Sequence, residues 1–154
     1  MKICIVRHGS AVAGTVNDQN RSLTEKGTMQ TEMAGKWLQT QTLTDPLCWH
    51  SPFLRTRQTA GNIILAGDYT SEEHSELTPD GSINALVDDL QKLQRDVILV
   101  SHLPLVGHLA SYLVDGEIRD QPWSPAECWL LEGDIAGPGC MTVISVWYPA
   151  LVKV

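Results

Sequence analysis

The sequence contains no long hydrophobic run. Its longest apolar stretches, such as residues 97–100, have the length of a strand and fall far short of the roughly 20 residues that cross a bilayer. Residues 1–7 lack the apolar length and the small-residue cleavage site of a signal peptide. We therefore expect no membrane partner and a cytoplasmic location.

Basic residues are also scarce. Of 154 residues, 11 are lysine or arginine and 18 are acidic, which gives a formal net charge of −7. Nucleic-acid-binding domains typically show the opposite balance, so we expect no nucleic-acid partner. A chain of this length is long enough for one substantial core, and residues 1–154 are predicted to form a single domain.

Cysteine is limited to four positions, none in Cys-x-x-Cys spacing: Cys4, Cys48, Cys128 and Cys140. Each lies in an apolar, strand-like context, so buried reduced thiols are expected rather than disulfides or metal ligands. His50, His74 and His108 show no metal-ligand spacing either. The sequence thus predicts neither a metal site nor a cofactor.

The hydrophobic pattern alternates between strands and helices along the chain. The expected strands are 2–6, 47–50, 96–101, 128–131 and 141–147. The expected helices are 24–41, 52–65, 80–94 and 104–114. Residues 10–22 and 66–78 are expected to be loops, and 133–139 a turn that joins the last two strands as an antiparallel hairpin. This order predicts an α/β three-layer sandwich with a mostly parallel central sheet and an antiparallel edge.

Local signals place the ends and faces of two helices. Thr24 is the expected N-cap of the first helix, and Ser51 followed by Pro52 is expected to start the second. The first helix carries large apolar side chains at helical spacing: Met29, Met33, Trp37 and Leu38. These four are expected to face the core.

Charged and aromatic side chains with related chemistry follow three of the predicted strands. Arg7-His8-Gly9 follows the first, residues 51–55 follow the second and Ser101-His102 follows the third. Since parallel strands end at the same edge of a sheet, these groups are expected to meet around one anion, with phosphate as the favoured ligand. Gly9 is expected to let the backbone turn sharply after the strand.

Two arginines compete for one place in this pocket. Arg55 and Arg57 lie two positions apart on the predicted helix and point in different directions, so only one of them easily reaches the site. Position alone does not decide between them.

The motifs together resemble those of the histidine phosphatase (phosphoglycerate mutase-like) superfamily. The resemblance rests on Arg7-His8-Gly9, residues 51–60 and 100–102, with 23–27 resembling the segment before the first helix, and it spans residues 3–108. Within that superfamily, the short length and the segments 76–79 and 101–107 are similar to the SixA-type protein phosphohistidine phosphatases.

The resemblance implies roles for four residues. His8 is expected to be the nucleophile, Arg7 and Arg55 to clamp the phosphoryl oxygens, and His102 to complete the pocket; Arg57 then becomes an ordinary surface residue. The two arginines are expected to hold the pKa of His8 below about 6.5, and a backbone carbonyl is expected to fix its tautomer.

A proton donor for the leaving group is less clearly marked. Related enzymes place a carboxylate there, and Glu76, just before residues 77–79, is the first candidate, with Asp18 in the first loop as the second. A phosphohistidine substrate would make less demand on such an acid, because its P–N bond breaks easily once the imidazole is protonated.

The expected function is removal of phosphate from phosphohistidine on a signalling or phosphocarrier protein, such as a histidine phosphotransfer domain, through a covalent phosphohistidine on His8. The short connection between residue 65 and Asp80 favours an open pocket that admits a side chain of another protein. Two alternatives remain: a phosphatase of small phosphomonoesters, and a catalytically silent phosphoprotein-binding module, for which an intact His8 has no use.

Overall fold

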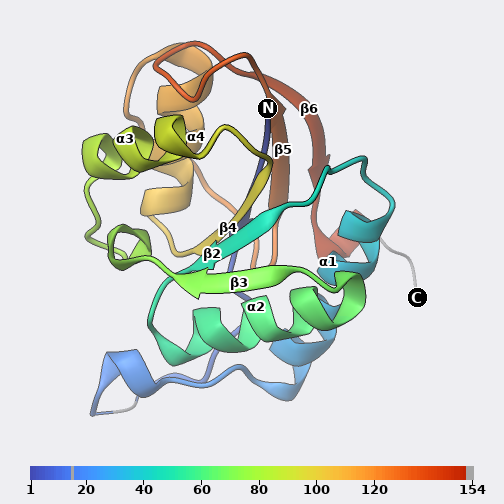
Figure 1. Ribbon diagram of the computed structural model, residues 1–154. Helices are drawn as coiled ribbons and strands as arrows, with labels where there is room; N and C mark the ends of the chain where they lie inside the picture. The colour runs from blue at the N-terminus through green and yellow to red at the C-terminus, as the bar shows by residue number, and fades with distance from the viewer. Residues whose placement is uncertain (15, 152–154) are drawn as a thin grey trace.

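A six-stranded sheet lies between two pairs of helices in the computed structural model (Figure 1), which describes residues 1–14 and 16–151. The strands are β1 (Lys2–Arg7), β2 (Leu47–His50), β3 (Thr70–Glu73), β4 (Val97–Ser101), β5 (Cys128–Glu132) and β6 (Thr142–Trp147). The α-helices are α1 (Glu25–Gln39), α2 (Leu54–Gly67), α3 (Ile83–Leu93) and α4 (Leu105–Asp115). Three short 3-10 helices are η1 (Asp18–Asn20), η2 (Ser75–Leu77) and η3 (Pro149–Leu151).

The strand order is β3-β2-β4-β1-β5-β6. β3, β2, β4 and β1 run parallel, whereas β5 and β6 form an antiparallel hairpin on the far side of β1. This confirms the predicted α/β class with a mostly parallel sheet and an antiparallel edge. Because the parallel strands end together, the residues that follow β1, β2 and β4 share one edge of the sheet.

Each face of the sheet has its own hydrophobic core. In β4, Val97 and Leu99 pack into the core under α3 and α4, while Ile98 and Val100 pack into the core under α1 and α2 (Figure 1). A strand buried on both faces reads as a continuous apolar run, which is why β4 was recognisable from the sequence. Burial of each such side chain contributes roughly 1.5–3 kcal/mol before conformational entropy is counted.

Helix α1 packs through smaller residues than expected. Thr24 caps it as predicted, its side chain accepting a hydrogen bond from the Gly27 amide. The expected apolar stripe was wrong in part, however: Leu38 is fully buried, but the Met29 side chain is 60% exposed. The helix instead buries these residues: Gly27, Gln30, Thr31, Ala34, Gly35 and Leu38. Its small residues allow close approach of backbones, a packing mode that a count of large apolar side chains does not detect.

The connection 66–78 is not wholly a loop. It contains β3, which pairs with β2 from Leu47↔Thr70 to His50↔Glu73 and forms the parallel edge of the sheet. β3 is polar and largely exposed, so its pairing depends on backbone hydrogen bonds and leaves no hydrophobic pattern in the sequence.

Two smaller expectations also needed correction. α2 begins at Leu54, two residues after Pro52, and its N-cap, Phe53, makes no side-chain capping bond. Of the four free cysteines, three are buried as predicted, but Cys140 is exposed. In the part of the chain that the structure describes, no helix has the length and apolar character to cross a membrane.

Candidate active site

The register of the parallel strands brings the predicted site residues to one edge of the sheet. Arg7 pairs with Ser101 across β1 and β4, and the His8 amide donates to the Ser101 carbonyl at 3.0 Å. On the other side of β4, the Ser51 amide donates to the Val100 carbonyl at 3.1 Å. The residues that follow three strands are thus fixed to one another by backbone hydrogen bonds.

Gly9 is required for close packing rather than for a turn. It is not among the glycines with positive φ, so the expected sharp turn does not explain it. A Cβ at this position would lie 2.7 Å from the Gly27 carbonyl oxygen and 2.8 Å from the Thr31 Cγ2 atom. The Gly9 amide also donates to the Thr59 hydroxyl at 3.2 Å. The loop after β1 therefore lies directly on the backbone of α1, which holds His8 in place.

His8 is held with one ring nitrogen available as a lone pair. Its Nδ1 lies 2.7 Å from the Gly9 carbonyl oxygen, which can only accept, so Nδ1 carries the proton. Its Nε2 accepts a hydrogen bond from Arg55 Nε at 3.3 Å. Burial, followed by the positive charges of Arg55 and Arg7, lowers the pKa of His8 to about 4, although the hydrogen bond with the Gly9 carbonyl acts in the opposite direction. The sequence predicted the direction of this shift but attributed it to the arginines, whereas burial is the larger cause.

His102 packs against His8. The centroids of the His8 and His102 rings are 5.2 Å apart. The centroid of the Phe53 ring lies 4.9 Å from that of the His102 ring. His102 Nε2 lies 2.9 Å from the Ser51 hydroxyl, while its Nδ1 is buried without a hydrogen-bond partner among the described residues. Burial, followed by the neighbouring His8 and Arg55, lowers the pKa of His102 to about 2. Both imidazoles are therefore neutral near pH 7.

Two guanidinium groups complete the cluster. Arg7 donates from Nη1 to the Trp123 carbonyl at 2.6 Å, and its buried Nε has no partner among the described residues. Arg55 is 4% exposed and its guanidinium carbon lies 5.1 Å from the centroid of the Phe53 ring. Burial lowers the pKa of both arginines, because a buried positive charge loses hydration. An anion bound between them would offset this electrostatic cost. Arg57 is exposed.

The two candidate proton donors lie in different surroundings. The Asp18 backbone carbonyl accepts from Arg55 Nη1 at 2.8 Å, and its carboxylate lies 3.3 Å from Arg55 Nη2. The Glu76 carboxylate accepts instead from the Ser82 amide at 3.3 Å, at the start of α3. Of the two, Asp18 makes direct contact with a member of the cluster.

The sequence and the fold match known phosphatases over most of the chain. The family model of the Histidine phosphatase superfamily (branch 1) matches residues 3–79. The phosphohistidine phosphatase SixA of Escherichia coli (strain K12) is 35% identical over 123 residues, which cover 76% of either chain. The chain belongs to the histidine phosphatase superfamily.

Further relatives agree with this membership. A SixA homolog of Haemophilus influenzae is 32% identical over 126 residues, covering 73% of this chain and 77% of the other. The solved structure of the protein histidine phosphatase SixA complexed with tungstate matches with a TM-score of 0.86 at 30% identity, covering 99% of this chain and 100% of that one. The similarity confirms the family inferred from the motifs and supports phosphatase activity.

The superfamily match and the geometry support different parts of the cluster. Residues 3–79 include Arg7, His8 and Arg55, whereas His102 lies beyond the matched segment. The placement of His102 beside His8 comes from the register of β4 with β1. The two kinds of observation are complementary.

The sequence did not reveal the role of two residues at the site. Ser51 was expected near the pocket as part of residues 51–55, but its only assigned role was to start a helix. Its hydroxyl lies against His102 and accepts from the Phe53 amide at 3.3 Å. Arg21 adds a third positive charge that lowers the pKa of His8, after burial and the charges of Arg55 and Arg7. Arg21 lies two positions before the recognised segment 23–27, which was the nearest signal in the sequence.

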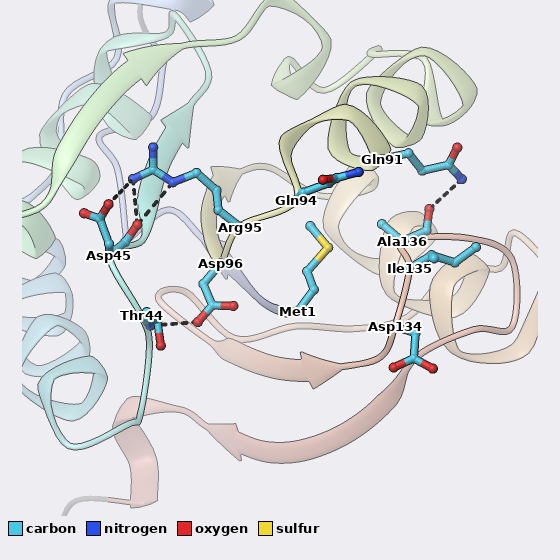
Figure 2. Close-up of a pocket in the computed structure, with 10 residues that line it drawn as sticks. All are labelled: Met1, Thr44, Asp45, Gln91, Gln94, Arg95, Asp96, Asp134, Ile135 and Ala136. Atoms are coloured by element: carbon cyan, nitrogen blue, oxygen red, sulfur yellow. Dashed lines mark hydrogen bonds and ion pairs between the residues drawn. The ribbon is translucent and has the colours of Figure 1, made fainter.

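One cavity of this superfamily member lies away from the cluster, at the amino ends of the parallel strands (Figure 2). It has a volume of about 750 Å³. Three of its charged groups have partners within the chain: Arg95 donates to the Asp45 carbonyl at 2.6 Å and approaches the Asp45 carboxylate at 3.4 Å, and Asp96 accepts from the Thr44 amide at 2.8 Å. Ligands of open α/β sheets bind at the carboxyl ends of strands. We therefore locate the candidate active site at the cluster around His8.

Proposed function

We propose that this chain removes the phosphoryl group from phosphohistidine on a signalling or phosphocarrier protein, such as a histidine phosphotransfer domain, through a phosphohistidine intermediate on His8. The observation that carries the proposal is the state of the His8 ring. Its Nδ1 is tied to the Gly9 carbonyl, and its Nε2 lone pair points to Arg55, the group expected to bind the phosphate. The relatives named phosphohistidine phosphatase support this substrate class.

In the first step, His8 Nε2 attacks phosphorus as the P–N bond of the substrate breaks. The bonding electron pair leaves with the substrate nitrogen, and the proton already on the substrate ring keeps the departing imidazole neutral. Arg7 and Arg55 stabilise the charge on the three equatorial phosphoryl oxygens, which is the main catalytic requirement of phosphoryl transfer. For this the Arg55 Nε–H turns from the His8 lone pair to an oxygen.

In the second step, water attacks the phosphorus of phosphorylated His8. The P–N bond breaks, the electron pair returns to Nε2, and phosphate leaves with the oxygen of the water. His102 contributes a neutral donor: when the Ser51 hydroxyl donates to Nε2, the proton of the ring is on the buried Nδ1, which then has a phosphoryl oxygen as its acceptor. The neutral ring adds no charge that would compete with the arginines.

The proposal is tested by trapping phosphate on the protein. The wild-type chain is mixed with a phosphotransfer domain labelled with ³²P on histidine and quenched in alkali, where phosphohistidine survives. We expect label on the wild type and none on His8→Ala. The matched control is His108→Ala on α4, whose ring binds Asp120 at 2.6 Å away from the cluster and which should label normally.

Steady-state rates with the phosphoprotein are then compared with those for sugar phosphates and nucleotides. Preference for the small molecules by a wide margin would overturn the substrate assignment. Label on His8→Ala equal to that of the wild type would overturn the assigned nucleophile, and binding of phosphoprotein without turnover would support the silent binding module.

A further inference from the structure

The carboxylate of Asp18 lies at the rim of the phosphate cluster. Arg55 uses three nitrogens in this arrangement: Nε donates to His8, and both Nη1 and Nη2 donate to Asp18. The Arg55 side chain is 5% exposed, whereas that of Asp18 is 56% exposed. Asp18 therefore borders the cluster on the side from which a substrate on another protein approaches.

A second arginine keeps Asp18 charged and in place. Arg21 Nη1 lies 3.0 Å from one carboxylate oxygen, and Arg21 is itself anchored by Nε to the Val12 carbonyl at 2.6 Å. The hydrogen bond from Arg21 lowers the pKa of Asp18, and the charge of Arg55 lowers it further. At neutral pH this residue is an anion, which is the wrong protonation state for the proton donor that the sequence suggested.

An anion at this place acts differently on two kinds of substrate. A phosphate monoester brings two negative charges to the Arg55 guanidinium, which already binds Asp18. The Asp18 carboxylate therefore competes with the monoester for Arg55 and repels the monoester. A phosphohistidine brings its phosphoryl group together with an imidazole ring that takes up a proton near neutral pH. The carboxylate attracts that cation.

We propose that Asp18 is a specificity-determining residue, which selects phosphoryl groups carried by a protonated imidazole over phosphate monoesters. This inference rests on the proposed function and extends it to the leaving group. The protonated ring is the form that departs as neutral imidazole when the P–N electron pair moves to nitrogen, without further proton transfer. A monoester leaves as an alkoxide or phenoxide that needs a proton, and an ionised Asp18 has none to give.

The test measures kcat/KM for two substrates, a histidine-phosphorylated peptide and phenyl phosphate, a monoester whose phenoxide needs a proton on leaving. In Asp18→Asn, which keeps the size of the side chain and removes the charge, the ratio of peptide to monoester should fall about tenfold, the order expected for loss of one charge-assisted contact. Inhibition by inorganic phosphate should become stronger in the same variant. Asp18→Ala should shift the ratio in the same direction, because the charge is the cause.

The matched control is Asp45→Asn at the opposite end of the sheet. Asp45 also pairs with an arginine, Arg95, at 3.4 Å, and the substitution changes the net charge equally. Its substrate ratio should equal that of the wild type. A ratio shifted as much in Asp45→Asn as in Asp18→Asn would mean that overall charge is responsible, and would overturn the proposal.

An equal loss of kcat/KM with both substrates in Asp18→Asn would also overturn the proposal, because Asp18 would then only position Arg55. Failure of this inference is distinguishable from failure of the proposed function. The latter fails if the wild type neither hydrolyses the phosphohistidine peptide nor takes label on His8, whereas the former fails with an active wild type and an unchanged ratio.

Discussion

The two ends of the parallel strands contain similar residue types but differ in how their polar atoms are paired. At the amino ends, Arg95 binds Asp45, and the Asp96 carboxylate binds the Thr44 amide at 2.8 Å (Figure 2). The same carboxylate binds the Lys2 amide, also at 2.8 Å. At the carboxyl ends, Arg7 Nε and His102 Nδ1 are buried without partners in the described part of the chain.

The cavity of about 750 Å³ lies at the amino ends of the strands, where Arg95 and Asp45 bind each other. A buried polar atom without a partner costs about 1–3 kcal/mol, and an anion that accepts from Arg7 and His102 would offset that cost. Cavity volume alone would have directed attention to the wrong end of this sheet. Whether the polar atoms have partners within the protein distinguishes a binding site from a cluster that only stabilises the fold.

The largest expected difference between the two ends is the effect on activity of removing one arginine from each. Arg55→Ala should lower kcat/KM for a phosphohistidine peptide roughly 10³-fold, because an arginine that stabilises the transferring phosphoryl group is lost. Arg95→Ala should stay within about twofold of the wild type, since distant sites act independently. The measurement is steady-state kinetics on both folded variants, and comparable losses in the two would show that the ends do not differ in function.

A second substitution tests whether the amino-end cluster is structural. Asp96→Ala removes the carboxylate that accepts from the Lys2 amide in β1 and from the Thr44 amide ahead of β2, leaving two amides without their charged acceptor. We expect a loss of about 3 kcal/mol in the free energy of unfolding, at about 1.5 kcal/mol per bond to a charged group.

Urea unfolding measures that loss, and kcat/KM at a temperature where the variant is folded should match the wild type. The control is Asp134→Ala. Asp134 lines the same cavity but makes no hydrogen bond or ion pair with the strand starts in the described part of the chain, so this variant should retain wild-type stability. An active-site defect in folded Asp96→Ala would contradict the structural role of this end.

The end proposed to be catalytic was more predictable from the sequence than the elements around it. Arg7, His8 and His102 each follow an apolar strand, and the geometry of parallel strands brings such residues together whatever the details of the helices. Arg55 was identified by the resemblance to a family, and its burial, against an exposed Arg57, agrees with that choice.

Other features leave no pattern in the sequence because they depend on contacts between distant residues. The exposed strand β3 is held by backbone pairing. The face of α1 is set by close approach of backbones, as at Gly35, where an added Cβ would lie 3.0 Å from the Ala66 Cβ. The contact between Ser51 and His102 joins residues 51 positions apart. Periodicity reports on burial within one element and carries no information about such pairs.

The most subtle difference between the ends is their response to pH. His8 has a pKa of about 4 in the folded protein against 6.5 in the unfolded chain. Between these values the unfolded chain binds more protons, so the stability falls as pH decreases from about 6.5 and the effect levels off below about 4. From pH 7 to pH 5 the loss is roughly 2 kcal/mol for such a histidine.

His8→Gln should therefore lose less stability over this range than the wild type, by about that amount, in urea unfolding at each pH. Thr59→Ser, which alters the same pocket without a titrating group, should keep the wild-type slope. A slope unchanged in His8→Gln would mean that His8 is not held neutral by the fold, and the lone pair on which its role as nucleophile depends would then be protonated over the same range.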